Sequence, residues 1–299
     1  MDQRLADLLA LLELEQLEVN LFRGSSRDIG SPQVFGGQVL GQALVAAYKT
    51  VEARACHSLH AYFLRRGDFN APIVYQVDRS LDGKSFANRR VVAIQHGEQI
   101  FHMSCSFQVS EPGMDHSATM PDVPPPEGLR DFDSYREELL ADLPEKVRSF
   151  FEHRRPFEFR PVCIPNYLDP VPLPPVKHVW LRAVDAVPTD DDRVHRCLLA
   201  YVSDYNLLDT ATLPHAKSFL HLQLASIDHG MWFHRGFRAD EWLLYSVDSP
   251  SASGARGFAR GSIFTRDGRL VASTAQEGLI RERDGAVPLA GVSASPAAS

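Results

Sequence analysis

Residues 224–237, LASIDHGMWFHRGF, combine groups capable of acid–base or metal chemistry with the hydrophobic pattern of a buried strand. One Asp, two His, one Ser and one Arg stand between Ile, Met, Trp and Phe. A polar group moved out of water without a partner costs roughly 2 to 7 kcal/mol, so each must be exposed, hydrogen-bonded or used. Whether each of these side chains is exposed, hydrogen-bonded or catalytic depends on the helices and strands that surround the segment.

Metal binding is the first chemistry to consider for such a segment. The candidates are His57 with His60, or Asp228 with His229 and His234. Neighbours at odd separation along a strand point to opposite faces, so Asp228 and His229 cannot converge on one ion without a bulge. We therefore expect no metal, and interpret Asp228, His229 and His234 as side chains that brace the strand through hydrogen bonds.

The chain contains an internal repeat that includes this segment. Tyr75, Val77 and Asp78 recur 170 positions later as Tyr245, Val247 and Asp248. Each copy shows a helical segment (GGQVLGQALVAAYKTV or DYNLLDTATLPHA), an aromatic strand (HSLHAYFLRR or ASIDHGMWFHR) and an alternating antiparallel meander. This order predicts an α+β fold. The first helical segment, apolar with three Gly, is expected to be buried on nearly all sides.

The repeat sets the expected domain boundaries. We predict an N-terminal helix over residues 2–17 within a first unit of residues 1–109, and a second unit of residues 178–285. Residues 110–177 are Pro-rich and are interpreted as a connection that carries a helix near residues 131–153. The small, polar residues 286–299 are expected to form a flexible tail.

Composition and missing motifs exclude several functions. With 31 basic against 38 acidic residues the net charge is −7, which argues against binding to nucleic acid or acidic membranes. Four cysteines without C-x-x-C spacing, and an amino terminus without signal-peptide character, indicate a cytoplasmic protein with reduced thiols. No apolar run approaches the ~20 residues of a membrane span. Rossmann, phosphate-loop, nucleophile-elbow and H-E-x-x-H motifs are all missing.

Six blocks in order carry a resemblance to a known family: FGGQVLGQAL, HSLHAYFLRRGD, YVSDYNLL, SIDHGMWFHR, EWLLYSVDSPSASGARGFARG and VASTAQEGLIR. Together they resemble the type II acyl-CoA thioesterases, the TesB-like family, over residues 14–281. The resemblance implies a double hotdog fold, in which two curved antiparallel sheets each wrap around a helix. It also implies a homodimer or homotetramer that hydrolyses medium- to long-chain fatty acyl-CoA without a cofactor.

By motif match, the family's catalytic set falls on Asp204, Ser226 and Gln276. A carboxylate accepts a proton from water, while a hydroxyl and an amide orient that water. We expect Asp204 at the start of the second copy's central helix, where the helix end favours its anionic form. The first copy has Cys105 in place of Gln276 and no acid at its helix start, which predicts one active site where the copies meet.

Other residues are candidates for binding substrate. Small, flexible backbone at Phe35, Gly36 and Gly37 is expected near the ligand. Met231 and Trp232 are expected along the acyl channel, and His57 is a rival general base. Four arginines are candidates for the phosphates of coenzyme A: Arg65, Arg66, Arg256 and Arg260.

Two other functions remain open from the sequence. A hotdog enoyl-CoA hydratase would need an Asp and His pair for proton transfer at carbon, and no suitable His follows Asp204 in the next turns. A non-catalytic acyl-CoA sensor would bind ligand without turnover, and should lack a complete Asp, Ser and Gln set.

Overall fold

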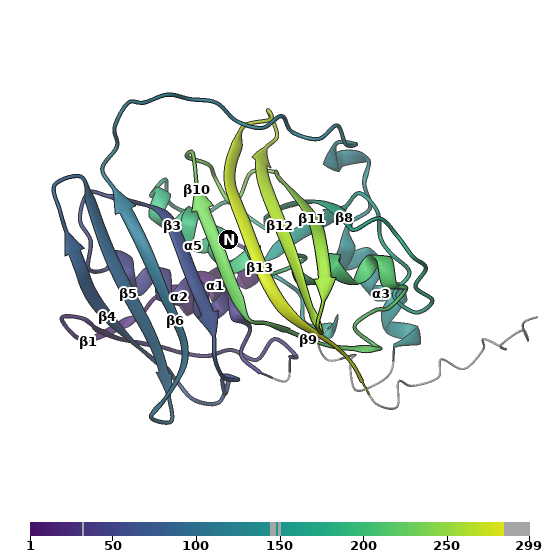
Figure 1. Cartoon of the computed structure of the whole chain (residues 1–299), viewed down its shortest axis with the longest axis horizontal. Coiled ribbons are helices and arrows are strands. Elements are labelled where there is room, and N and C mark those ends of the chain that lie inside the picture. Colours follow the sequence, from purple (N-terminus) through teal and green to yellow (C-terminus); the bar gives the residue numbers. More distant parts are fainter. Residues whose placement is uncertain (32, 144–147, 149–150, 284–299) are drawn as a thin grey trace, which may run out of the picture.

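The computed structural model describes residues 1–31, 33–143, 148 and 151–283, and its strands form one antiparallel sheet (Figure 1). Helices α1, α2 and α5 lie together on one side of this sheet. The predicted tail, residues 286–299, lies outside the described residues.

The elements of the first copy follow the predicted order. They are α1 (Gln3–Leu12), β1 (Glu15–Glu18), β2 (Leu21–Gly24), α2 (Gly36–Tyr48), β3 (Ala55–Phe63), β4 (Ile73–Asp82), β5 (Phe86–Gln95) and β6 (Glu98–Gln108). The segment that follows contains η1 (Pro126–Gly128), α3 (Phe132–Asp142) and β7 (Phe157–Pro161). Strand β7 joins the edge of the sheet, so residues 110–177 contribute more than a connection.

The second copy repeats the pattern with one additional helix. Its elements are β8 (Val176–Ala183), α5 (Asp192–Ser203), η2 (Leu208–His215), β9 (Leu222–Ser226), β10 (Asp228–Phe233), β11 (Leu243–Ser253), β12 (Arg256–Thr265) and β13 (Leu270–Glu282).

The strand order makes the duplication visible. It runs β1-β2-β4-β5-β6-β3-β10-β13-β12-β11-β8-β7, with β9 paired to β13. The two halves are therefore arranged as images of each other about the β3–β10 junction, where Leu59 lies opposite Met231. Each half contributes an aromatic strand to this junction, which joins the copies by backbone hydrogen bonds.

Helix α2 is the buried helix that the sequence predicts. Of its residues, all except Gly36 and Val45 are buried. Its main neighbour is α5, which the sequence analysis did not identify. Helix α5 begins after Asp191, whose side chain accepts a hydrogen bond from the Arg193 backbone N–H, a typical N-cap. The helical segment expected at residues 204–216 is instead the 3₁₀ helix η2, which packs against β8, β9, β11, β12 and β13.

The close contact of α2 and α5 depends on a glycine. A Cβ atom built on Gly37 would lie 2.1 Å from the backbone carbonyl oxygen of Tyr201 in α5. A side chain there would push the two helices apart. This explains why one of the two glycines at the start of α2 stands at this position.

The N-terminal helix is shorter than predicted, because α1 ends at Leu12 and residues 15–18 form β1. Glu13 already has an extended backbone at φ −73° and ψ 117°. Pairing with β2 then determines the conformation, and Glu15 forms an ion pair with Arg23 across the two strands. This pairing overrides the local helical pattern.

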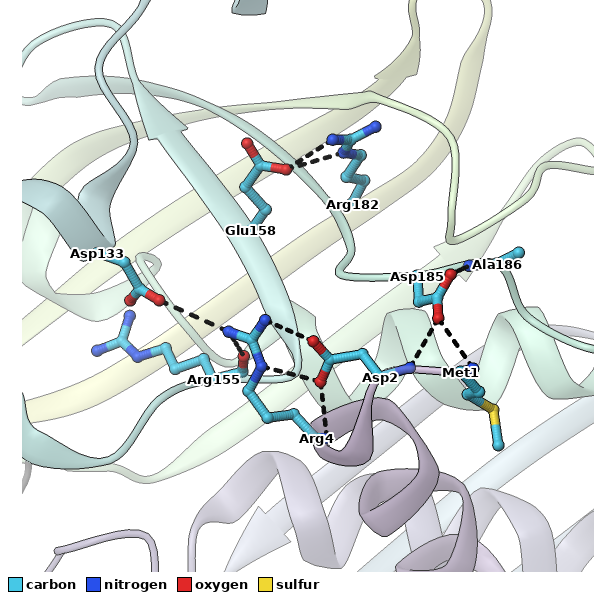
Figure 2. A network of polar contacts seen from close by, with 9 residues as sticks. All are labelled: Met1, Asp2, Arg4, Asp133, Arg155, Glu158, Arg182, Asp185 and Ala186. Carbon is cyan, nitrogen blue, oxygen red and sulfur yellow. Dashed lines mark hydrogen bonds and ion pairs between the residues drawn. The ribbon is translucent and has the colours of Figure 1, made fainter.

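The start of the chain is docked onto the second copy (Figure 2). The Asp2 backbone N–H donates to Asp185 Oδ2 over 2.7 Å, and Arg4 bridges from Asp2 to Asp133 at the start of α3. The Arg4 guanidinium lowers the pKa of Asp2 to about 2. Helix α1 thus connects the first copy to both the intervening segment and the second copy.

The substitution Gly37→Ala tests the α2–α5 contact. Overpacking at this crossing is expected to lower the free energy of unfolding by about 1–3 kcal/mol, because the new Cβ meets backbone rather than a flexible side chain. Urea unfolding measures the change. Gly113→Ala is the control, since a Cβ at Gly113 meets no atom within 4 Å. Equal stability of the two variants would contradict this account of the crossing.

Candidate active site

Asp204, Ser226 and Gln276 meet in one cluster. The Ser226 hydroxyl donates to Asp204 Oδ1 over 3.3 Å, and the Gln276 amide Nε2 donates to the same oxygen over 2.8 Å. The three residues come from the end of α5, the end of β9 and the interior face of β13. The structure therefore brings together all three residues that the family resemblance indicates.

Asp204 does not begin a helix, as the sequence analysis expected. It is the C-cap of α5, with helical backbone angles of φ −78° and ψ −12°. The C-terminal end of a helix carries partial negative charge and does not favour an anion. The carboxylate is instead held by donors from two strands, which replace the expected helix-end effect.

A β-bulge turns Ser226 toward this cluster. Opposite β13, Ser226 pairs with Gly278 and Gly230 pairs with Ala275, so the register shifts by one residue between them. Ser226 and His229 are three residues apart and would point to opposite faces of a regular strand. Because of the bulge around Ile227, both side chains face the interior. The Asp228 carboxylate stabilises the bend by accepting a hydrogen bond of 2.7 Å from the Glu277 backbone N–H.

His229 is buried beside the cluster, with both ring nitrogens hydrogen-bonded. Nδ1 lies 3.1 Å from Gln276 Nε2, and Nε2 lies 3.0 Å from Ser203 Oγ. Burial lowers the pKa of His229 from its ordinary value, although the charges of Asp204 and Asp228 oppose this effect. The predicted bracing contacts are thus present for His229, and His234 also makes one, to Ser273.

A cavity of about 780 Å³ opens next to Asp204 and Ser226. Phe35 and Gly36 from the first copy, which the sequence analysis expects near the ligand, line it. A Cβ atom on Gly36 would lie 2.6 Å from Asp204 Oδ2, so the first helix approaches the carboxylate as closely as a glycine allows. Gly37 contacts α5 instead of the cavity. The cluster therefore lies where the two copies meet.

Aromatic residues that the sequence analysis did not single out form much of the cavity wall. They are Phe132, Phe151, Tyr167 and Phe219. The Phe219 ring lies 5.1 Å from Phe151 and 5.5 Å from Tyr167, measured between ring centroids. Three of these four residues belong to the segment between the copies. Their aromatic character was the available signal, but no repeat or motif places that segment against the site.

Three predicted substrate-binding residues lie elsewhere. Met231 is fully buried in the core, because it alternates with His229 on the interior face of β10. Trp232 points to the other face and packs against His60 at a centroid distance of 5.1 Å. His57 Nε2 lies 2.8 Å from Ser106 Oγ, and burial lowers its pKa. The described cavity lining contains none of these three side chains, and their contact with substrate stays a prediction.

The cavity lining includes none of the four arginines proposed for coenzyme A. Arg65 pairs with Glu98, Arg256 with Glu277 and Arg260 with Asp248. Among the described residues, no group of three His, Cys, Asp or Glu side chains could hold a metal ion. None of the described helices is both long enough and apolar enough to cross a bilayer.

The first copy has an apolar counterpart of this cluster. By the repeat, Cys56, Leu59 and Cys105 correspond to Ser226, His229 and Gln276, and β3 has a similar register shift between Cys56 and Ser58. Both cysteines are buried, which raises the pKa of Cys56 to about 12 and that of Cys105 well above its ordinary value. These thiols stay protonated at neutral pH. The predicted asymmetry between the copies is therefore present in the structure.

Comparisons with known proteins identify the family of the chain. Residues 146–279 match the family described as acyl-CoA thioesterase, and residues 23–108 match the acyl-CoA thioesterase N-terminal domain. The chain is 43% identical over 284 residues to Acyl-CoA thioesterase 2 of Haemophilus influenzae, covering 94% of this chain and 99% of that protein. It is 42% identical over 289 residues to human Acyl-coenzyme A thioesterase 8, covering 94% and 90%.

Solved structures agree with the fold. The acyl-CoA thioesterase II TesB2 of Mycobacterium marinum aligns with a TM-score of 0.75 and 44% identity, over 94% of this chain and 100% of that one. A hot dog fold protein from Alicyclobacillus acidocaldarius aligns with a TM-score of 0.73 at 18% identity, over 92% and 98% of the two chains. The predicted α+β double hotdog fold is confirmed.

The burial of His229 predicts a pH dependence of stability. Its pKa is lower in the folded protein than the ordinary value of about 6.5 expected after unfolding, so the unfolded chain binds more protons as pH falls. The stability that neutral His229 contributes is fully present above the pKa of the unfolded chain. It is lost as pH falls from there through the lower pKa of the folded protein. The difference in urea midpoint between wild type and His229→Asn should therefore shrink from pH 7 to pH 5.

The exposed His116 supplies the control for this measurement. The variant His116→Asn should keep the pH dependence of the wild type. A wild-type and His229→Asn difference that stays constant between pH 7 and pH 5 would contradict the assignment of His229 as a buried neutral side chain.

Proposed function

The chain belongs to the acyl-CoA thioesterase family, and we propose that Asp204, Ser226 and Gln276 hold the water that hydrolyses its substrate. It is a thioester hydrolase, which converts acyl-CoA to a free acid and coenzyme A. The observation that carries the mechanism is the pair of hydrogen bonds that fix the Asp204 carboxylate at the wall of the cavity.

The carboxylate is arranged to act on water. Oδ1 accepts both hydrogen bonds, while Oδ2 lies on the side of Gly36, which also lines the cavity. A water bound at Oδ2 transfers a proton to Asp204 as its oxygen attacks the thioester carbon. With two donors on Oδ1, the carboxylate is held as an acceptor for water and is a weak nucleophile toward carbon.

The start of α2 is suited to hold the thioester oxygen. Its N-cap, Phe35, makes no capping hydrogen bond through its side chain in the described chain, and the first backbone N–H groups of a helix have no partner within the helix. These donors and the positive end of the helix lie beside Asp204 at Gly36. Donors fixed in advance stabilise the negative charge that develops on the oxygen during attack.

Collapse of the tetrahedral intermediate breaks the carbon–sulfur bond. The departing thiolate has a conjugate acid with a pKa near the thiol reference of about 8.5, so it leaves without strong assistance from an acid. The proton on Asp204 then passes to the thiolate or to solvent, and the carboxylate is restored. The difficult step is thus the attack of water, which is the step that the cluster serves.

The cavity fits a hydrocarbon chain of medium to long length. The aromatic side chains of Phe132, Phe151 and Phe219 line it together with Leu222 and Leu224. Burial of apolar surface favours binding by about 25 cal/mol per Å². We infer that the acyl chain extends along this wall from the thioester at Asp204.

We also infer the cellular setting and the assembly. All four cysteines are free thiols, and Cys163 is exposed, as suits a reducing cytoplasm. The described sheet ends at β1 and β7, and edge strands of this kind can pair with another chain. A homodimer or homotetramer is consistent with these edges.

Asp204→Asn tests the proposed base. The amide cannot accept a proton from water, so kcat should fall on the order of 10²- to 10⁴-fold. Release of free thiol from decanoyl-CoA measures the rate. Asp267→Asn, in the exposed turn between β12 and β13, is the matched control and should keep wild-type activity.

Wild-type turnover by Asp204→Asn would remove Asp204 from the mechanism. Wild-type protein that consumes crotonyl-CoA without releasing thiol would contradict hydrolysis and favour a hydratase. Binding of acyl-CoA without either reaction would favour a sensor.

Phe219→Ala tests the acyl cavity. Removing this ring from the wall enlarges the cavity. The maximum of kcat/KM should therefore shift to acyl chains longer by about two carbons or more, because each added methylene gains apolar contact of about 0.8 kcal/mol. A series of acyl-CoA esters measures the profile. Phe86 is an exposed aromatic outside the described lining, so the control Phe86→Ala should leave the profile unchanged. An unchanged profile in Phe219→Ala would contradict the placement of this ring against the acyl chain.

A further inference from the structure

The two N–H bonds of the Gln276 amide are both occupied. Nε2 lies 2.8 Å from Asp204 Oδ1 and 3.1 Å from His229 Nδ1. An ionised carboxylate can only accept hydrogen bonds, so the NH₂ group rather than the carbonyl of Gln276 must face Asp204. The second N–H then points to the imidazole nitrogen.

This direction fixes the tautomer of His229. If Nδ1 accepts from Gln276, the ring proton is on Nε2, which donates to Ser203 Oγ over 3.0 Å. The Ser203 hydroxyl in turn donates to the Ala200 carbonyl over 3.0 Å, within the last turn of α5. Gln276 therefore donates in two directions: to the Asp204 carboxylate, and through His229 and Ser203 to the Ala200 carbonyl of α5.

Asp204 by itself cannot keep the amide in this orientation through turnover. When it takes a proton from water it becomes a possible donor, and a rotated Gln276 could then accept through its carbonyl. His229 is buried and bonded at both nitrogens, so its acceptor at Nδ1 persists while the charge of Asp204 changes.

The remaining polar atom of Gln276 is its carbonyl oxygen. Oε1 is buried and has no hydrogen-bond partner among the described residues. With both N–H groups occupied, Gln276 has no donor left for the thioester oxygen. Because Gln276 is fully buried and does not line the described cavity, its contact with the site is the hydrogen bond to Asp204 Oδ1.

We propose that His229 is a positioning residue that fixes the Gln276 amide, so that its NH₂ group keeps donating to Asp204 Oδ1 through turnover and the thioester oxygen is left to other donors. This inference rests on the proposed function of Asp204 and Gln276. Leu59, the counterpart of His229 in the first copy, has no such acceptor.

Two substitutions separate the acceptor at Nδ1 from the rest of the ring. His229→Asn places an amide oxygen near the position of Nδ1 and keeps the acceptor for Gln276. His229→Gln places its amide near the position of Nε2, toward Ser203, and removes that acceptor. The two variants share polarity and differ in which neighbour they reach.

Steady-state kinetics with decanoyl-CoA is the test. His229→Gln should lower kcat on the order of 10²-fold with KM unchanged, as expected when a group at the reacting centre is misplaced while binding is intact. His229→Asn should stay within about threefold of wild-type kcat. Wild-type kcat in His229→Gln, or equal losses in both variants at equal thermal stability, would overturn the proposal.

Two further measurements keep the result clear. Asp204→Asn, assayed in parallel, reports on the proposed function, and an active variant would contradict that function. An inactive Asp204→Asn together with a fully active His229→Gln would exclude only the role of His229. Nitrogen-15 NMR of the wild-type protein at neutral pH should show a proton on Nε2 of His229 and none on Nδ1. A proton on Nδ1 would overturn the proposal without any variant.

Discussion

The site depends on one buried carboxylate being held by donors from two strands. Asp204 Oδ1 accepts from Ser226 and from Gln276, at the end of a helix whose dipole disfavours an anion. Because Oδ1 is occupied, Oδ2 is the oxygen presented to the cavity beside Gly36. The strand bulge, the crossing of α2 and α5, and the orientation of the Gln276 amide are all needed for this geometry.

The duplication explains how one chain supplies such an asymmetric site. The two halves share strand order, a buried helix that is α2 in the first and α5 in the second, and a register shift at the same place in the aromatic strand. The residues around this register shift are polar in the second copy, where Ser226 and Gln276 stand. Cys56 and Cys105 stand at the corresponding positions of the first copy. The first copy contributes the start of α2 to the cavity instead. In the proposed mechanism, each copy thus supplies a different part of the site.

The sequence predicts the repeat, the meanders and α2 because these depend on local hydrophobic periodicity. It indicates Asp204, Ser226 and Gln276 through family resemblance. It does not reveal the bulge near Ile227, because a shift of register depends on pairing with β13. Met231 and Trp232, which the sequence analysis expects along the acyl channel, lie outside the described lining of the cavity. Helix α5 does carry a local signal that the sequence analysis missed, the N-cap Asp191 before an amphipathic segment. The aromatic wall at Phe132 and Tyr167 depends on contacts between distant segments, which local patterns do not contain.

The central claim is that Asp204 acts on water and not on the acyl carbon. A single turnover with enzyme in excess, in water enriched in oxygen-18, tests it most directly. The account predicts one labelled oxygen in the released fatty acid and no label in the peptide that contains Asp204. Unlabelled fatty acid with oxygen-18 in that peptide would show that the carboxylate attacks the thioester itself, and would contradict the account.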